Sequence, residues 1–167
     1  ITELVDYGVA LTVADEHSLA VIQQADLEKP AKVHLKVDTG MGRLGLPWQE
    51  AAALARKVAV SKKMELEGVW THFAASDDEA RAFTLEQLEN FQNFLAAIKR
   101  EGIEPKLVHA ANSAATLAFP EAHFDLVRPG IAVYGYHSSP VTQKLESRLT
   151  PVMTLTAPIT FIKKVKA

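Results

Sequence analysis

Short runs rich in branched and aromatic residues alternate along the chain with segments of helical spacing. The runs predict strands at residues 9–13, 33–38, 68–73, 106–111 and 124–128. Strands that are separated by helices indicate βαβ units and a parallel sheet, in which the crossovers are right-handed. Two α/β architectures fit this pattern: a doubly wound sheet and a β/α barrel.

Helix signals fill the gaps between these runs. Asp15 is a typical N-cap for a helix that runs to about residue 28. Pro47 suits the first turn of a second helix, which residues 51–63 continue with good helix formers.

The longest helix is predicted to end near Arg100, with Gly102 as its stop signal. Ser76 and Glu79 have the spacing of a capping box ahead of it. Apolar residues recur in this segment at intervals of three or four and predict one buried stripe: Phe83, Leu85, Leu88, Phe91, Leu95 and Ile98.

The pattern changes after Gly135. Residues 136–148 are polar and loop-like, whereas residues 150–167 are apolar strand material with no helix between. This change predicts the start of a β domain behind the α/β region.

Composition narrows the classes of protein that are possible. Of the 167 residues 48% are hydrophobic and 23% charged, which excludes disorder for the bulk of the chain. The net charge of −2 argues against a protein that holds nucleic acid by charge alone. No cysteine is present, so disulfides and cysteine-bound zinc are excluded and a reducing compartment fits. No apolar run approaches the roughly 20 residues of a membrane helix.

Both ends of the sequence predict a piece of a longer chain. The first residue is Ile1 rather than methionine, and the last residues stop inside a strand-like stretch. A complete β/α barrel needs about 250 residues, so five strands are a little over half of one.

Candidate chemistry gathers where the predicted strands end, because parallel strands deliver functional groups at their C-terminal ends. The strand at 33–38 places His34, Lys36 and Asp38 on one face, and a loop with three glycines and Arg43 follows it. These charges form either a satisfied ion network or part of a site.

The next three strands end in further polar groups. His72 closes one strand, and Asn112 and Ser113 follow another at the N-terminus of a short helix-like segment. They form either an ordinary N-cap or an anion site built on the free N–H groups there. The fifth strand ends at Arg128, and Gly130 after it offers a backbone N–H to a ligand.

Four motifs in this order resemble the alanine racemase family, whose members are pyridoxal-phosphate (PLP) enzymes of fold type III. The motifs are KVDTGMGRLG at 36–45, THF at 71–73, HAANSAA at 109–115 and RPGIAVYG at 128–135. The resemblance runs through essentially the whole chain.

The resemblance implies a partial β/α (TIM-type) barrel of about five of eight strands, followed by the first strands of a C-terminal β domain. The corresponding boundaries are 1–135 for the PLP-binding barrel part, 136–149 for a linker and 150–167 for the start of the β domain. The family interconverts L-alanine and D-alanine in the bacterial cytoplasm, supplying D-alanine for peptidoglycan. It works as a homodimer whose active site takes groups from both subunits. No nucleic-acid, membrane or metal partner is implied.

The same resemblance assigns roles around PLP. Ser113, Gly130 and Ile131 would bind its phosphate, since hydroxyl and backbone donors suit a dianion, and Asn112 would support their loop. Arg128 would face the pyridine nitrogen. A cation there disfavours protonation of that nitrogen, which weakens the ring as an electron sink and limits transamination.

Further roles follow for the remaining polar residues. Arg43 would contact the phenolic oxygen of PLP and the substrate carboxylate. His72 and His109 would contact the ring or fix its hydrogen bonds. Asp38 would support the site without touching PLP itself. Lys36 matches a lysine that is carbamylated in some members, and a carbamate would give Arg43 an anionic partner.

Two parts of the family pattern are missing from the chain. Racemisation needs a base on each face of the α-carbon. The family uses a PLP-anchoring Lys followed by Ala-Tyr-Gly and a Tyr from the C-terminal domain of the other subunit. Neither motif occurs here, so the chain contains no catalytic base and is expected to be inactive alone. A partial barrel also leaves open sheet edges, which predicts poor stability.

Three other interpretations remain open. The parent protein could be a racemase of the same fold for another amino acid, such as serine. The chain could be a non-catalytic remnant that binds PLP or phosphate. A metal-dependent barrel hydrolase would have to use residues from this set: Asp38, His72, Asp77, Asp78 and His109.

Overall fold

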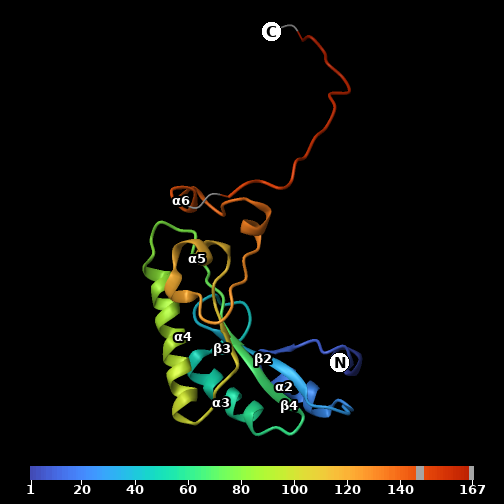
Figure 1. Ribbon diagram of the computed structural model, residues 1–167, viewed down its shortest axis with the longest axis vertical. Coiled ribbons are helices and arrows are strands. Elements are labelled where there is room, and N and C mark those ends of the chain that lie inside the picture. Colours follow the sequence, from blue (N-terminus) through green and yellow to red (C-terminus); the bar gives the residue numbers. More distant parts are fainter. Residues whose placement is uncertain (146–148, 166–167) are drawn as a thin grey trace.

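The computed structural model describes residues 1–145 and 149–165. Four strands pair in parallel in the order β1 (Leu11–Val13), β2 (Ala31–Asp38), β4 (Met64–Trp70) and β5 (Leu107–His109). The two-residue strand β3 (Leu46–Pro47) pairs in parallel with the end of β2. The predicted parallel α/β sheet is therefore confirmed (Figure 1).

The strand order decides between the two architectures. Each main strand pairs with the one that follows it in sequence, with a helix between them. A doubly wound sheet would reverse this order about its first strand. The sheet is therefore a sector of a β/α barrel.

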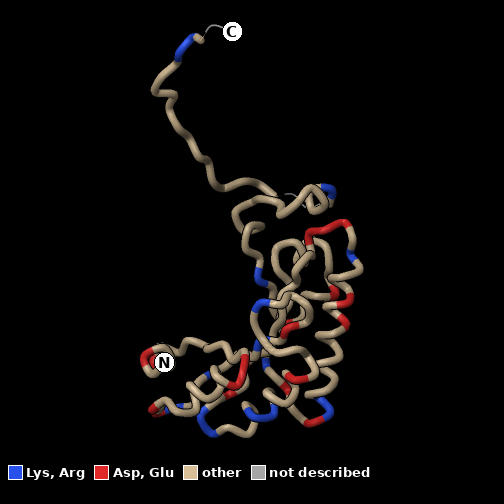
Figure 2. The backbone as a smooth tube through the Cα atoms, turned by 180° about the vertical axis from the view of Figure 1, so that it is seen from behind, with Lys and Arg blue, Asp and Glu red and all other residues tan. Residues whose placement is uncertain are grey.

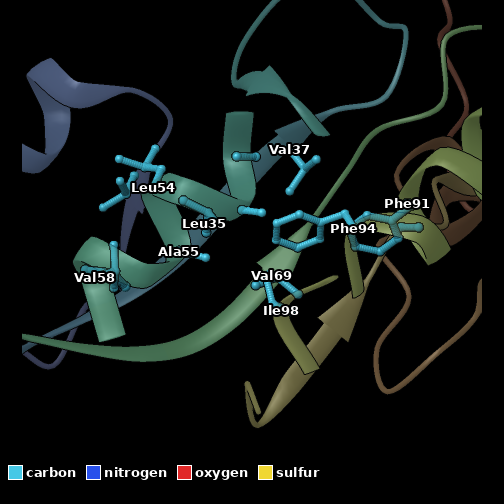
Figure 3. Packing of buried hydrophobic residues seen from close by; sticks show 14 of the residues in the cluster. Leu35, Val37, Leu54, Ala55, Val58, Val69, Phe91, Phe94 and Ile98 are labelled. Atoms are coloured by element: carbon cyan, nitrogen blue, oxygen red, sulfur yellow. The ribbon is translucent and has the colours of Figure 1, made fainter. Parts of the chain in front are cut away.

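The core lies between the sheet and the helices on its outer face. α2 (Glu16–Gln24), α3 (Trp48–Ala59) and α4 (Ala82–Arg100) supply apolar side chains that bury the odd-numbered face of β2. Figure 3 shows Leu35 and Val37 of β2 among side chains from α3 and α4. The even-numbered face of β2 points to the barrel interior, which leaves its polar side chains available for a site.

Most helix signals are confirmed, with shifted ends. Asp15 caps α2, since its carboxylate accepts a hydrogen bond from the backbone N–H of Ser18 at 2.7 Å. The helix ends at Gln24 rather than near residue 28. Pro47 is the N-cap of α3, which ends at Ala59 because the chain then turns into β4.

The long helix ends as predicted, but its predicted start is wrong. α4 stops at Arg100, and Gly102 follows with a φ of 73°. The helix begins at Ala82, and the Ser76 hydroxyl instead donates to Oδ1 of Asn112 at 2.8 Å. Glu79 does not complete a capping box either, because its carboxylate pairs with Lys144 at 2.8 Å.

The predicted stripe on α4 is correct in its second half only. Leu88, Phe91 and Ile98 are buried, whereas Phe83 and Leu85 are 41% and 44% exposed. The buried arc starts instead at Thr84 and also takes in Gln87 and Phe94. Phe83 and Leu85 flank Thr84 on either side, about 100° away around the helix, and therefore miss the core.

The fifth predicted strand is reduced to a single bridge. Leu126 forms an isolated parallel bridge with His109, after Phe124 with its positive φ of 47°. Two backbone hydrogen bonds, Asp125 N–H to Val108 at 3.0 Å and Arg128 N–H to Ala111 at 2.9 Å, still hold this segment along β5. Arg128 therefore reaches the edge of the sheet as expected.

The remaining elements are short. They are α1 (Thr2–Asp6), α5 (Ser113–Ala118), α6 (Pro140–Gln143) and the 3-10 turns Pro120–Ala122 and Ile131–Tyr134.

Residues 149–165 form no helix or strand and extend away from the body (Figure 1). The expected strands are therefore not formed in that range, where the side chain of Leu155 is 98% exposed. A strand needs a neighbour for its backbone hydrogen bonds, and no strand lies beside these described residues. The C-terminal β domain stays a prediction.

Charge is spread over the body rather than collected on one face. Figure 2 shows Lys and Arg interspersed with Asp and Glu around the helices and strands. Over residues 1–145 and 149–165, no helix combines the length and the apolar character that crossing a membrane would require.

Candidate functional site

Arg128 is held by several neighbours at the C-terminal end of the sheet. One guanidinium nitrogen, Nη1, lies 2.5 Å from Nδ1 of His109. The other, Nη2, donates to the carbonyls of Thr71 at 2.8 Å and Ala110 at 3.2 Å. The guanidinium carbon lies 5.0 Å from the Trp70 ring centroid, within cation–π range. Burial lowers the pKa of Arg128 to about 10, so it remains a fixed cation at neutral pH.

His109 is held neutral beside this cation. His109 is only 6% exposed, and the ring of Trp70 stacks parallel to its imidazole at a centroid distance of 5.9 Å. Burial, and then the charges of Arg128 and His34, lower the pKa of His109 to about 4. His109 therefore serves as a neutral acceptor and not as an acid at neutral pH.

The depressed pKa of His109 predicts a loss of stability in mild acid. Between pH 6.5, its ordinary pKa, and about pH 4, the unfolded chain binds this proton and the folded chain does not. The free energy of unfolding therefore falls as the pH drops through this window, by about 3 kcal/mol in all. Urea unfolding at pH 7.5 and pH 5 measures the change. His109→Gln should flatten the pH dependence of the free energy of unfolding. The control His17→Gln changes an exposed histidine and should leave that dependence unchanged. An unchanged pH dependence in His109→Gln contradicts the depressed pKa of His109.

Lys36 is buried in the barrel interior, with 1% of its surface exposed. Its Nζ donates to the carbonyl of Val37 at 2.6 Å and lies 5.3 Å from the Trp70 ring centroid. Burial is the main cause that lowers the pKa of Lys36 to about 8. The charge of Asp38 opposes this shift, and the charges of Arg43 and Arg128 add to it. Among the described residues no ion pair joins Lys36 to Asp38, so the interpretation as a satisfied ion network does not hold.

Asp38 instead shapes the loop that carries Arg43. Its carboxylate accepts hydrogen bonds from the backbone N–H groups of Gly40 at 3.0 Å and Gly42 at 3.1 Å. Gly45 has a φ of 97°, and a side-chain carbon there would lie 2.8 Å from the carbonyl oxygen of Lys36. Arg43 is exposed and makes no hydrogen bond or ion pair to any residue that the structure describes. Among the described residues, nothing competes with an anion for its guanidinium.

His72 lies in the same positive field. Burial, followed by the charges of Arg128 and Arg43, lowers its pKa below the ordinary value. The buried Gln87 of α4 fixes the backbone around it, donating from Nε2 to the His72 carbonyl at 3.1 Å and accepting from Ala74 N–H at 2.9 Å. Sequence reasoning missed Gln87; a polar residue inside the apolar arc of α4 was its only signal.

Ser113 and the turn after Arg128 come together at the end of β5. The Ser113 hydroxyl accepts a hydrogen bond from Ala132 N–H at 3.3 Å and lies 3.8 Å from where a side-chain carbon on Gly130 would be. Asn112 caps α5, because its Oδ1 accepts from Ala115 N–H at 3.0 Å. Ile131 begins the 3-10 turn and is 46% exposed.

Unused backbone donors follow Ser113 in the chain and precede Ala132 in the turn that contacts its hydroxyl. Within residues 1–145 and 149–165, the N–H groups of Ala114, Gly130 and Ile131 donate to no acceptor. Together with the Ser113 hydroxyl they form a set of neutral donors, which suits a phosphate dianion. The donor set therefore fits a phosphate group, and Arg128 adds a fixed positive charge at the ends of the same strands.

A cavity of about 240 Å³ opens on the interior face of the sheet beside Arg128. It is lined by Ala10, Thr12, His34, Trp70, His109 and Arg128. Trp70 was not singled out from the sequence, because its role depends on stacking with a residue of another strand. The residues considered for a metal site do not converge: over the described part of the chain, no three acidic or histidine side chains gather at ion-binding distance.

Comparison with known proteins gives one consistent result. Residues 1–138 match the family described as "Alanine racemase, N-terminal domain". The alanine racemase of Treponema denticola is 45% identical over 99% of this chain and 45% of its own length. That of Carboxydothermus hydrogenoformans is 42% identical over 100% of this chain and 46% of its own length. The chain thus spans under half the length of these relatives.

Solved structures agree with the sequence matches. The alanine racemase of Bacillus anthracis with bound L-Ala-P superimposes with a TM-score of 0.82 at 36% identity, over 90% of this chain and 40% of that one. The cycloserine complex from Clostridium difficile gives a TM-score of 0.80 at 28% identity, over 90% of this chain and 42% of that one.

Proposed function

This chain belongs to the alanine racemase family, and we propose that it is the cofactor-holding part of a longer racemase that interconverts L-alanine and D-alanine with PLP. One observation carries the assignment of the site. Arg128 is fixed by His109 and two carbonyls beside the donors of Ser113 and the turn at Gly130. The arrangement supports a phosphorylated ring with an unprotonated nitrogen.

The chemistry that PLP supplies when bound is electron withdrawal from the α-carbon of an amino acid, which makes the α-proton acidic. The Ser113 hydroxyl and the N–H groups of Gly130 and Ile131 would hold the phosphate. Arg128 would place its positive charge against the ring nitrogen and keep a proton off it. Arg43, which has no partner within the described residues, binds the carboxylate of the amino acid and orients its α-carbon.

Lys36 supports Arg43 once it carries a carbamate. Its pKa of about 8 leaves more neutral amine near neutral pH than an ordinary lysine has. Neutral amine forms an N–C bond to carbon dioxide and releases one proton to solvent. The product is an anion in the field of both arginines, and it holds Arg43 in place.

Proton transfer itself falls outside this chain. The sequence contains no Lys followed by Ala-Tyr-Gly, the family motif that supplies one base. The family takes the other base from the C-terminal domain of a second subunit, so we propose that both bases lie outside this chain. This chain alone therefore binds and orients without turning over.

The experiment is a racemisation assay with the complete protein and PLP. We expect D-alanine to form from L-alanine, faster than D-serine forms from L-serine, and no product from the 167-residue chain alone. No D-alanine from the complete protein overturns the function. Preference for serine reassigns the substrate, and product from the chain alone contradicts the placement of the bases.

A further inference from the structure

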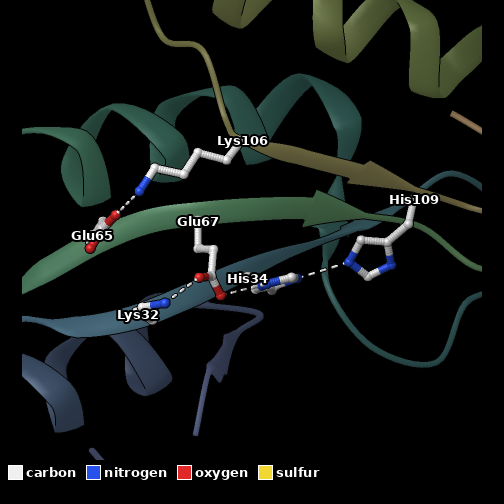
Figure 4. Close-up of polar contacts among 6 residues, drawn as sticks. All are labelled: Lys32, His34, Glu65, Glu67, Lys106 and His109. Atoms are coloured by element: carbon white, nitrogen blue, oxygen red, sulfur yellow. Dashed lines mark hydrogen bonds and ion pairs between the residues drawn. The ribbon is translucent and has the colours of Figure 1, made fainter. Parts of the chain in front are cut away.

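A line of hydrogen bonds crosses the interior face of the sheet from Arg128 to its opposite end. His109 Nε2 lies 2.8 Å from His34 Nδ1, and His34 Nε2 lies 3.2 Å from a carboxylate oxygen of Glu67. The other oxygen of Glu67 accepts from Lys32 Nζ at 2.7 Å. Figure 4 shows the part of this line that runs from His109 of β5 to His34 of β2 and on to Glu67 of β4 and Lys32 of β2.

The backbone is built to admit these contacts. The pairing of β2 with β4 shifts register between Val33 and His34, so that His34 faces Gly68. A side-chain carbon at Gly68 would lie 2.6 Å from the His34 ring, so glycine leaves the space that the imidazole fills. The shift also brings the neighbouring Glu67 within reach of that ring.

Only one set of proton positions satisfies every bond in the line. A guanidinium donates and never accepts, so Nδ1 of His109 is the acceptor and its proton lies on Nε2. That proton is donated to Nδ1 of His34, whose own proton lies on Nε2 and is donated to Glu67. The ionised carboxylate only accepts, so it ends the line.

The surroundings keep Glu67 an acceptor. The side chains of His34 and Glu67 are 17% and 18% exposed, so the bond between them is largely withdrawn from water. The hydrogen bond from Lys32 is the largest cause that lowers the pKa of Glu67. Glu65, on the same strand, pairs with Lys106 and takes no part in the line.

We propose that Glu67 is a positioning residue for Arg128: by accepting the last hydrogen bond, it fixes the tautomers of His34 and His109 and keeps Nδ1 of His109 available to the guanidinium. If His34 reversed, its Nδ1–H would oppose the Nε2–H of His109. His109 would then have to reverse as well and present a proton to Arg128. The proposal rests on the proposed function only for what Arg128 does toward PLP; the tautomers are independent of it.

The test is ¹⁵N NMR of histidine side chains in the complete protein without PLP or alanine. We expect His34 and His109 each to show a protonated Nε2 and an unprotonated Nδ1, with assignments from His34→Gln. A protonated Nδ1 on His109 overturns the proposal. Because no substrate is present, this readout fails or succeeds separately from racemase activity.

Three variants then test Glu67 itself. Glu67→Leu removes the acceptor at similar size, and should move both imidazoles toward mixed tautomers and weaken PLP binding about tenfold, the equivalent of one lost hydrogen bond. Glu67→Gln keeps an acceptor oxygen and should restore both. The matched control Glu65→Leu breaks the pair with Lys106 and should change neither. Unchanged tautomers in Glu67→Leu, or the same change in Glu65→Leu, overturn the proposal.

Discussion

Replacing Arg128 by Gln in the complete protein should lower kcat for alanine racemisation by about a hundredfold or more, the order of magnitude lost when a preorganised hydrogen-bond donor is removed from an active site. The guanidinium is fixed by four neighbours, namely His109, Thr71, Ala110 and Trp70. A glutamine side chain carries no charge and is too short to reach them all. Steady-state kinetics with L-alanine measure the effect.

Two further variants separate the fixed geometry of Arg128 from its charge. Arg128→Lys keeps the charge, but its single ammonium lacks the planar fork that reaches His109 with one nitrogen and the carbonyls of Thr71 and Ala110 with the other, so we expect it to recover only part of kcat. The surface control Arg56→Gln breaks an exposed pair with Glu101 and should leave kcat unchanged. An Arg128→Gln enzyme of normal kcat contradicts the role of this residue.

Gly45→Ala should lower the free energy of unfolding by about 3 kcal/mol. About 1–2 kcal/mol comes from placing a side chain at positive φ, and the rest from overpacking. The new carbon would lie 2.8 Å from the Lys36 carbonyl oxygen and 3.0 Å from Asp38 N, and both atoms belong to the buried strand β2. Urea unfolding of the complete protein measures the loss.

Gly42→Ala is the matched control for this prediction. Gly42 has a φ of 68° in the same loop, but nothing lies within 4 Å of the added carbon. It should therefore show only the conformational cost of about 1–2 kcal/mol. Equal losses in the two variants contradict the close contact at Gly45.

The parts of the fold that rest on local chemistry could be predicted from the sequence. Asp15 and Asn112 cap helices because their side chains reach backbone donors three residues ahead. Ser76 fails as a cap because a tertiary partner, Asn112, takes its hydroxyl. Phe83 and Leu85 show the same limit, since spacing alone does not fix where the buried arc of a helix begins.

The candidate site divides in the same way. Because parallel strands end at one edge of the sheet, the sequence could predict that Lys36, His72 and Arg128 lie together. The positive charge of Arg128 lowers the pKa of both Lys36 and His72. Glu67 depends on a register shift between two strands, which no pattern within one strand reveals. Gln87 likewise acts across the core, between helix α4 and the end of strand β4.

A crystal structure of the complete protein with PLP tests the central claim most directly, because it locates the phosphate and the ring nitrogen. We predict the phosphate against the Ser113 hydroxyl and the N–H groups of Gly130 and Ile131, with the ring nitrogen facing Arg128. PLP seated elsewhere, or with its ring nitrogen turned away from Arg128, would contradict the assignment of this chain as the cofactor-holding part of the racemase.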